Sequence, residues 1–236
     1  MNPIDIIRYI VWYASQNDIR LTTNRLVKFI YLVDLYNARL KDGDTLTGFP
    51  WKFIHYGPYC SEAMDFIEQA VHQNLINMET YDSLYQADND YHMFSCNDEN
   101  ADNLKDSFHI GVLVQIQKVI KKFGDDTPQL LDYVYFHTEP MMGVKKGDLL
   151  DFSKVEKFAS IPIVKLNKLS PQSIRHAREQ IKKLGEALDA DRHNLNQDNE
   201  ETDKYKDESY FKFIEMLDGD ELVVGLKGTS KIQITE

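Results

Sequence analysis

The side chain best placed to do chemistry is the carboxylate of Asp34, which stands inside an apolar stretch of the chain. An unpaired carboxylate in apolar surroundings is costly, so Asp34 needs water, a hydrogen-bonding partner or a catalytic use. Three interpretations stay open. Asp34 lies in water at the edge of an apolar helix face, or it anchors another segment, such as His55, Tyr56 or the amides near Gly57. In the third interpretation it works in acid–base catalysis with His55 or His137.

The other reactive side chains form no recognised catalytic or metal-binding pattern. None of the seven histidines stands three or four residues from another, the spacing that places two metal ligands on one helix face. Cys60 stands near an expected helix start, where a thiolate is favoured, but no basic residue is committed to it, which favours a small structural cysteine. The glycines lack the pattern of a phosphate-binding loop. The sequence therefore predicts no catalytic residue, no metal and no cofactor.

Size and composition are those of a globular protein, with 236 residues, 42% hydrophobic and 28% charged. The chain has no apolar run near the roughly 18–20 residues that a membrane span needs. Its N-terminus has no basic stretch followed by an apolar one, so we expect no secretory signal. The two cysteines, Cys60 and Cys96, make no disulfide framework. We expect a cytoplasmic protein without a membrane partner.

The negative charge is concentrated near the C-terminus. The chain has a formal charge of −11, and positions 186–221 hold 13 acidic and four basic residues. Broad binding to phosphate backbones needs a field of lysine and arginine, so this balance argues against nucleic acid as a partner. The acidic segment suits a solubilising linker or a surface that meets a basic partner, and both interpretations stay open.

The elements that position these residues are mostly helices. An extended aromatic segment is expected at 49–56, followed by a rigid break at Gly57-Pro58, where proline starts the next helix. A small β-hairpin or three-stranded unit is expected within 75–96. Apolar spacing and capping residues predict helices at 4–16, from the caps 21–23 to the turn 41–44, and at 61–71, 108–123 and 127–136.

These elements predict an α+β fold that is predominantly α-helical. We expect a compact helical domain with a small β-hairpin or sheet, plus a short C-terminal α/β tail. The shift to acidic, polar composition after the last long helix suggests the boundaries. The expected units are a helical domain at 1–165, an additional helix at 166–190, an acidic linker at 191–207, and a short helix plus β-hairpin at 208–236.

Four motifs stand in order along the first two thirds of the chain. They are a leucine–threonine helix start, a helix of the form Lys-Leu-x-Lys-Leu-x-Tyr-x-x-Asp in which Arg25 replaces the first lysine, an aromatic segment with Tyr-Gly-Pro, and a later Thr-x-Pro. Over roughly residues 1–160 this pattern resembles the Panacea domain, the SocA-like antitoxin family of bacteria and phages. The family-motif residues, which we expect to be structural, are Leu26, Lys28, Tyr31, Asp34, Trp51, Tyr56, Gly57, Pro58, Thr138 and Pro140.

The resemblance implies a non-enzymatic protein of a bacterial or phage toxin–antitoxin system. Such a protein binds and neutralises a partner toxin or delivers it for proteolysis. The implied partners are a cognate toxin, met through the acidic C-terminal region, and a protease or adaptor. The alternative is a winged-helix-like transcriptional regulator that binds nucleic acid through Arg20, Arg25 and Lys28.

Overall fold

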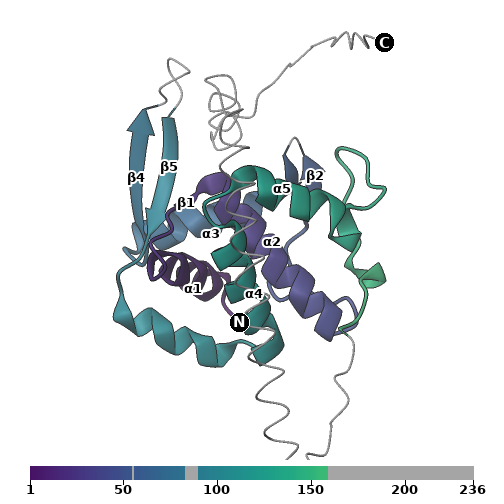
Figure 1. Ribbon diagram of the computed structural model, residues 1–236, viewed down its shortest axis with the longest axis horizontal. Helices are drawn as coiled ribbons and strands as arrows, with labels where there is room; N and C mark the ends of the chain where they lie inside the picture. Colours follow the sequence, from purple (N-terminus) through teal and green to yellow (C-terminus); the bar gives the residue numbers. More distant parts are fainter. Residues whose placement is uncertain (55, 83–89, 159–236) are drawn as a thin grey trace, which may run out of the picture. The chain divides into compact units, whose positions relative to one another are not determined.

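The computed structural model describes residues 1–54, 56–82 and 90–158, which form a mostly helical α+β fold, as predicted (Figure 1). The expected boundary at residue 165, the helix at 166–190, the acidic linker at 191–207 and the C-terminal unit at 208–236 lie outside the described residues. His55 lies outside them as well.

Helix α2 (Thr23–Leu40) forms the centre of the core. Thr22 caps it, because its side-chain oxygen accepts the backbone N–H of Arg25 at 3.5 Å. Residues on all faces of α2 are buried, as expected for a helix that is enclosed by others. The helices that contact it are α1 (Pro3–Ser15), α3 (Ser61–His72), α4 (Ile110–Phe123) and α5 (Thr127–Phe136) (Figure 1).

A three-stranded antiparallel sheet begins directly before α2. Its order is β1–β5–β4, with β1 at Leu21–Thr22, β5 at Asp90–Ser95 and β4 at Asn77–Asp82. The register places Leu21 opposite Phe94. The prediction of a small β unit within 75–96 is confirmed, and β1, which lies directly before α2, joins it by pairing with β5.

The Gly57-Pro58 segment is a strand, so the prediction that its proline starts a helix is wrong. β2 (Lys52–Ile54) and β3 (Gly57–Tyr59) form an antiparallel hairpin in which Ile54 lies opposite Gly57. Proline is tolerated here because a strand at the edge of a sheet has no ladder bond to lose on its outer side. Helix α3 begins at Ser61, which confirms the helix predicted at 61–71.

The chain after α5 returns to β2 and forms an extra rung beside it. The N–H of Gly147 donates to the carbonyl of Phe53 at 2.7 Å, and the N–H of Phe53 donates to Asp148 at 3.0 Å. Leu149 forms an antiparallel bridge with Lys52. Three short 3₁₀ helices complete the described part, namely η1 (Glu99–Ser107), η2 (Glu139–Met141) and η3 (Phe152–Lys154).

Candidate functional site

The motif residues of α2 form a buried row of polar side chains. Lys28, Tyr31 and Asp34 are spaced three residues apart, so they lie on neighbouring turns of one side of the helix. None of them is more than 3% exposed. We call these three residues the α2 polar row. Each bonds to a different segment that the motifs had singled out, so the row gathers residues that are far apart in the sequence.

Asp34 anchors the loop that follows α2. Its Oδ1 accepts the backbone N–H groups of Leu46 and Thr47, both at 2.8 Å. Its Oδ2 accepts the Thr47 hydroxyl at 2.5 Å and the indole N–H of Trp51 at 2.7 Å. Burial raises the pKa of Asp34, and these four hydrogen bonds oppose the increase. The anchor interpretation is confirmed, but the partners are Leu46, Thr47 and Trp51 rather than Tyr56 or the amides near Gly57, and the suggested partner His55 lies outside the described residues.

Tyr31 connects α2 to the later Thr-x-Pro motif. Its hydroxyl donates to Oγ1 of Thr138 at 2.9 Å, and the Thr138 hydroxyl donates to the carbonyl of Val134 at 2.5 Å. The Tyr31 ring also packs edge-on against Trp51, with centroids 5.7 Å apart. Thr138 has no exposed surface, and Pro140 is buried two residues later in η2. Tyr31 therefore fixes the point at which the chain leaves α5.

Lys28 connects α2 to the β2–β3 hairpin. Its Nζ donates to the carbonyl of Pro58 at 3.0 Å. Among the described residues no carboxylate lies within ion-pair distance of this amine. Burial alone lowers the pKa of Lys28 to about 7, because the charged form loses its water without gaining a counter-ion.

Gly57 lies next to this lysine and directly follows Tyr56 in the chain. Gly57 has a φ of +98°, which residues with a Cβ rarely adopt. A Cβ at this position would stand 3.5 Å from Cε of Lys28, an ordinary contact, so the backbone conformation and not space requires glycine. Tyr56 is half-buried near Tyr135. Burial raises the pKa of Tyr135 to about 12, and the nearby Tyr56 adds to this increase. Leu26 is a fully buried core residue.

The proposed acid–base pairing of Asp34 with His137 is not formed. His137 is exposed, and its ring stacks on Tyr133 with centroids 5.9 Å apart. Both residues lie in the described part of the chain, and no hydrogen bond or ion pair joins Asp34 to His137. The other candidate partner, His55, lies outside the described residues.

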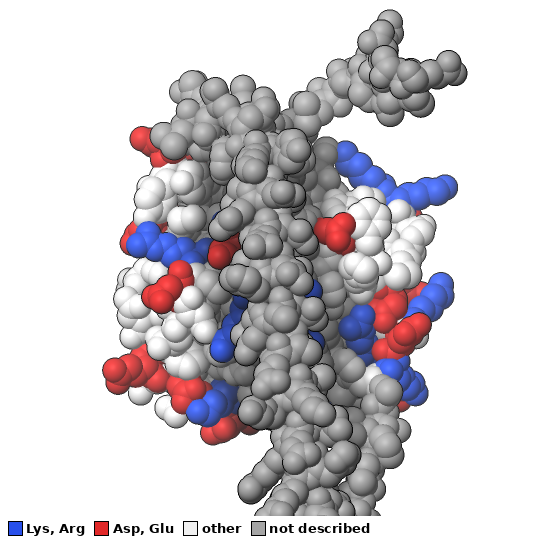
Figure 2. Space-filling model, in the orientation of Figure 1, with Lys and Arg blue, Asp and Glu red and all other residues white. Residues whose placement is uncertain are grey.

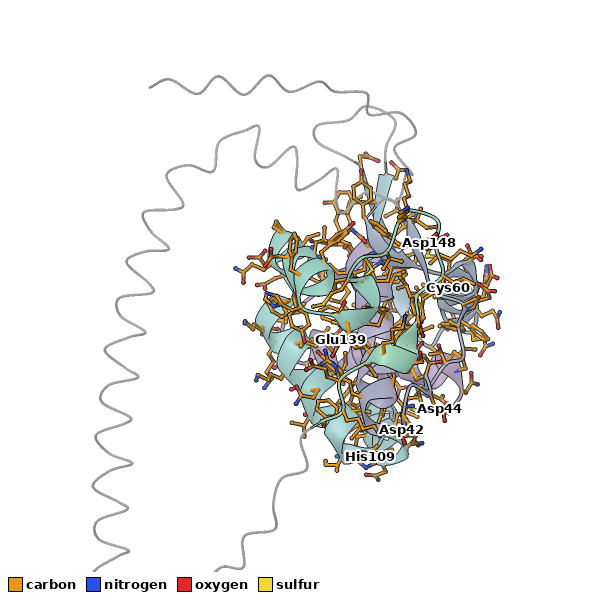
Figure 3. The ribbon with its side chains drawn as sticks, turned by 90° about the vertical axis from the view of Figure 1, so that its right-hand side faces the viewer. Asp42, Asp44, Cys60, His109, Glu139 and Asp148 are labelled. Atoms are coloured by element: carbon orange, nitrogen blue, oxygen red, sulfur yellow. The ribbon has the colours of Figure 1, made fainter. Side chains whose placement is uncertain are left out.

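Cys60 occupies a position where a thiolate is disfavoured. Its side chain is 2% exposed at the N-terminal cap of α3, and its Sγ lies 3.0 Å from a carboxylate oxygen of Glu62 (Figure 3 labels Cys60). Burial, together with the hydrogen bond to Glu62, raises the pKa of Cys60 to about 12. Within residues 1–54, 56–82 and 90–158, no group of three or more His, Cys, Asp or Glu side chains could hold a metal ion.

The three cations considered for nucleic-acid binding already have partners within the fold. Arg20 donates to Glu79 at 3.1 Å and to the hydroxyl of Tyr81 at 2.7 Å. Arg25 donates to the carbonyl of Gly124 at 2.7 Å, and Lys28 is buried as described above. Figure 2 shows acidic and basic side chains interspersed over the visible described surface, without a broad basic field. No helix of the described residues is long and apolar enough to cross a membrane.

A hollow that the sequence did not reveal lies beside η2, directly after Thr138, the hydrogen-bond partner of Tyr31. Its volume is about 450 Å³, and the segments that surround it are η2, the loop from 142 to 151, and η3. Met142 is 62% exposed and Leu149 is 61% exposed, although both are large apolar side chains. The residues that line it are Glu139, Pro140, Met142, Gly143, Val144, Asp148, Leu149, Asp151 and Lys154; Figure 3 labels Glu139 and Asp148.

An ion pair holds one wall of this hollow. Arg39 of α2 binds Glu139 through two hydrogen bonds, Nε to Oε1 at 3.2 Å and Nη2 to Oε2 at 2.7 Å. Both side chains are less than one fifth exposed. Burial would raise the pKa of Glu139, but the hydrogen bonds and charge of Arg39 outweigh burial and lower it. Met141-Met142 and Leu149-Leu150, two apolar doublets around a polar turn, are the sequence signal for this surface.

The chain was compared with protein-family models, with curated proteins and with solved structures. No family model matches it. No curated protein and no solved structure matches it either. The geometry of the site therefore stands on its own.

Proposed function

We propose that this protein is an antitoxin-like protein of the cytoplasm. It binds a partner toxin of a bacterial or phage toxin–antitoxin system and neutralises it, or delivers it to a protease or adaptor. The resemblance of the motif residues to the Panacea family motivates this proposal, and the arrangement of those residues supports it.

The observation that carries the proposal is the convergence of the motifs on α2. Lys28, Tyr31 and Asp34 each bond to another motif segment, at Pro58, Thr138 and Trp51. A motif set that matched by chance would have no reason to form one connected network. Because every polar group of the row has a partner inside the fold, the row holds the segments of Pro58, Thr138 and Trp51 in place on α2. A surface whose segments are held in place loses less entropy when it binds a partner.

The surface that this body presents also supports a binding role. The backbone carbonyl of Trp51, the partner of Asp34, accepts the N–H of Leu150 at 2.8 Å. Thr138, the partner of Tyr31, lies four residues before Met142. The segments fixed by the polar row are thus the ones that carry the exposed Met142 and Leu149. Two large apolar side chains exposed at one hollow offer a contact surface to a partner.

The test is co-expression with the product of the neighbouring open reading frame. That product alone should arrest growth, and co-expression of this chain should restore it. A pull-down with immunoblotting then separates the two routes, because direct neutralisation retains the toxin in a complex whereas proteolytic delivery removes it. The absence of both rescue and complex would refute the proposed function.

The matched variants are Asp34→Ala and Ile110→Ser. Asp34→Ala removes the anchor of the loop, so rescue should weaken together with stability. Ile110 is 66% exposed on α4, away from the row, so Ile110→Ser should rescue growth as well as the natural chain does.

A further inference from the structure

We propose that the hollow between η2, the loop from 142 to 151 and η3 is the docking site for a partner segment that inserts an apolar side chain beside a lysine or arginine. This inference rests on the proposed function for its biological partner, but the site can be tested without that partner. The occupant follows from the apolar surface, the charge and the size of the hollow.

The apolar part of the hollow is preorganised. Leu149 is 61% exposed, yet its backbone is held by the bridge to Lys52 and by the neighbouring bonds of Phe53 with Gly147 and Asp148. An exposed leucine on a fixed backbone loses little conformational entropy on binding. Met142, at 62% exposure, adds a flexible thioether that adapts to the shape of a partner side chain. Together they offer the apolar contact that a partner's anchor residue needs.

The charge of the hollow favours a cation next to that anchor. Its lining side chains include three carboxylates, Glu139, Asp148 and Asp151, against one ammonium, Lys154. Arg39 neutralises Glu139, and Lys154 lies 3.3 Å from Asp151.

Asp148 is the carboxylate that remains for a partner. It accepts the backbone N–H of Lys145 at 3.1 Å, and no side chain of the described residues forms an ion pair with it. Lys145 and Lys146 stand in the same loop, but their side chains do not line the hollow. A lysine or arginine of a partner therefore meets an available carboxylate.

The size of the hollow accommodates this occupant. A volume of about 450 Å³ lies in the range of roughly 300–1,000 Å³ typical of binding pockets. Such a space takes one large apolar side chain and the aliphatic stem of a neighbouring basic residue. Gly143 and Gly147, with φ of +75° and +96°, allow the turns of the loop that carries the rim.

The experiment uses the full chain, labelled with ¹³C at the methionine methyl groups, and a defined peptide probe. The probe contains Arg-Leu-Phe-Arg between Gly-Ser flanks, and a control probe replaces both arginines with glutamate. We expect the basic probe to shift the Met142 methyl signal in a saturable way at concentrations up to about 1 mM, whereas the acidic probe does not. No shift of Met142 up to that concentration would overturn the inference.

Three single substitutions locate the site. Leu149→Asp and Asp148→Lys should each weaken binding of the basic probe at least about tenfold, the latter because it reverses the charge that meets arginine. Ile110→Asp is the matched control, because Ile110 is equally exposed on α4 and lines no part of the hollow. All three positions are at the surface, so a thermal melt should show a folded chain. Equal affinity of all variants would refute the docking site.

The same variants separate this inference from the proposed function. If the natural chain neutralises a toxin and Leu149→Asp does not, the proposed function and the docking inference both stand. If Leu149→Asp neutralises it as well, the toxin binds elsewhere and the docking inference falls, while the proposed function stands. If the natural chain neutralises no toxin but the basic probe binds at Met142, the proposed function falls and the hollow remains a docking site.

Discussion

Lys28 makes the stability of this protein depend on pH in a direction that can be measured. Its amine is buried without a counter-ion, and burial lowers its pKa from the ordinary 10.5 to about 7. In the unfolded chain the amine is in water, so between about pH 7 and pH 10.5 unfolding takes up one proton. The free energy of unfolding therefore rises with pH through this window, and below about pH 7 both states carry the proton and the dependence ends.

The size of the effect follows from the two pKa values. One pH unit corresponds to about 1.4 kcal/mol per proton taken up. From pH 7 to pH 9 the folded amine changes from half protonated to almost neutral while the unfolded one stays charged. Lys28 should then contribute about 2 kcal/mol of additional stability at pH 9 relative to pH 7.

Urea unfolding of the natural chain and of Lys28→Met, measured between pH 6 and pH 9, isolates this contribution. Other titrating groups are common to both proteins, so they cancel in the difference between the two free energies. The same substitution at Lys52, which is exposed on β2, controls for loss of a lysine from the unfolded chain. If the curves of the natural chain and Lys28→Met run parallel from pH 7 to pH 9, Lys28 is not buried as an uncompensated amine and the reasoning is wrong.

Three further outcomes are expected. Asp34→Ala leaves the indole N–H of Trp51 and two backbone N–H groups without their acceptor. The free energy of unfolding should therefore fall by about 3–5 kcal/mol in urea titrations. A loss below about 1 kcal/mol would contradict the anchor role. Tyr31→Phe and Thr138→Val should each cost about 1 kcal/mol, with a coupling energy near that value in a double-mutant cycle, whereas additive losses would mean that their hydrogen bond contributes nothing. Burial raises the pKa of Cys60 to about 12, so its thiol should react slowly with a disulfide reagent at pH 8. In a Cys96→Ser background, the reaction in the folded chain should be at least about a hundredfold slower than in urea. Equal rates would show that Cys60 is exposed.

The amino-acid sequence alone determined most of the local elements, although not the strand at Gly57–Tyr59. Apolar residues at helical spacing and the caps at Thr22 made α2 readable, and its polar residues Lys28, Tyr31 and Asp34 could be placed on one side of it. The small sheet within 75–96 followed from alternation and turn residues. Helical spacing and strand alternation are patterns of residues a few positions apart, so the sequence contains what is needed to predict these elements.

Only the tertiary structure decided what those polar residues bond to. Asp34 pairs with Thr47 and Trp51, and Tyr31 pairs with Thr138, 107 positions away. The return of the chain to β2 decided that Leu149 is exposed, which its apolar type does not suggest. Hydrogen-bond partners and exposure across such distances depend on how whole elements pack, because a buried polar group takes whichever partner the packing brings within about 3 Å.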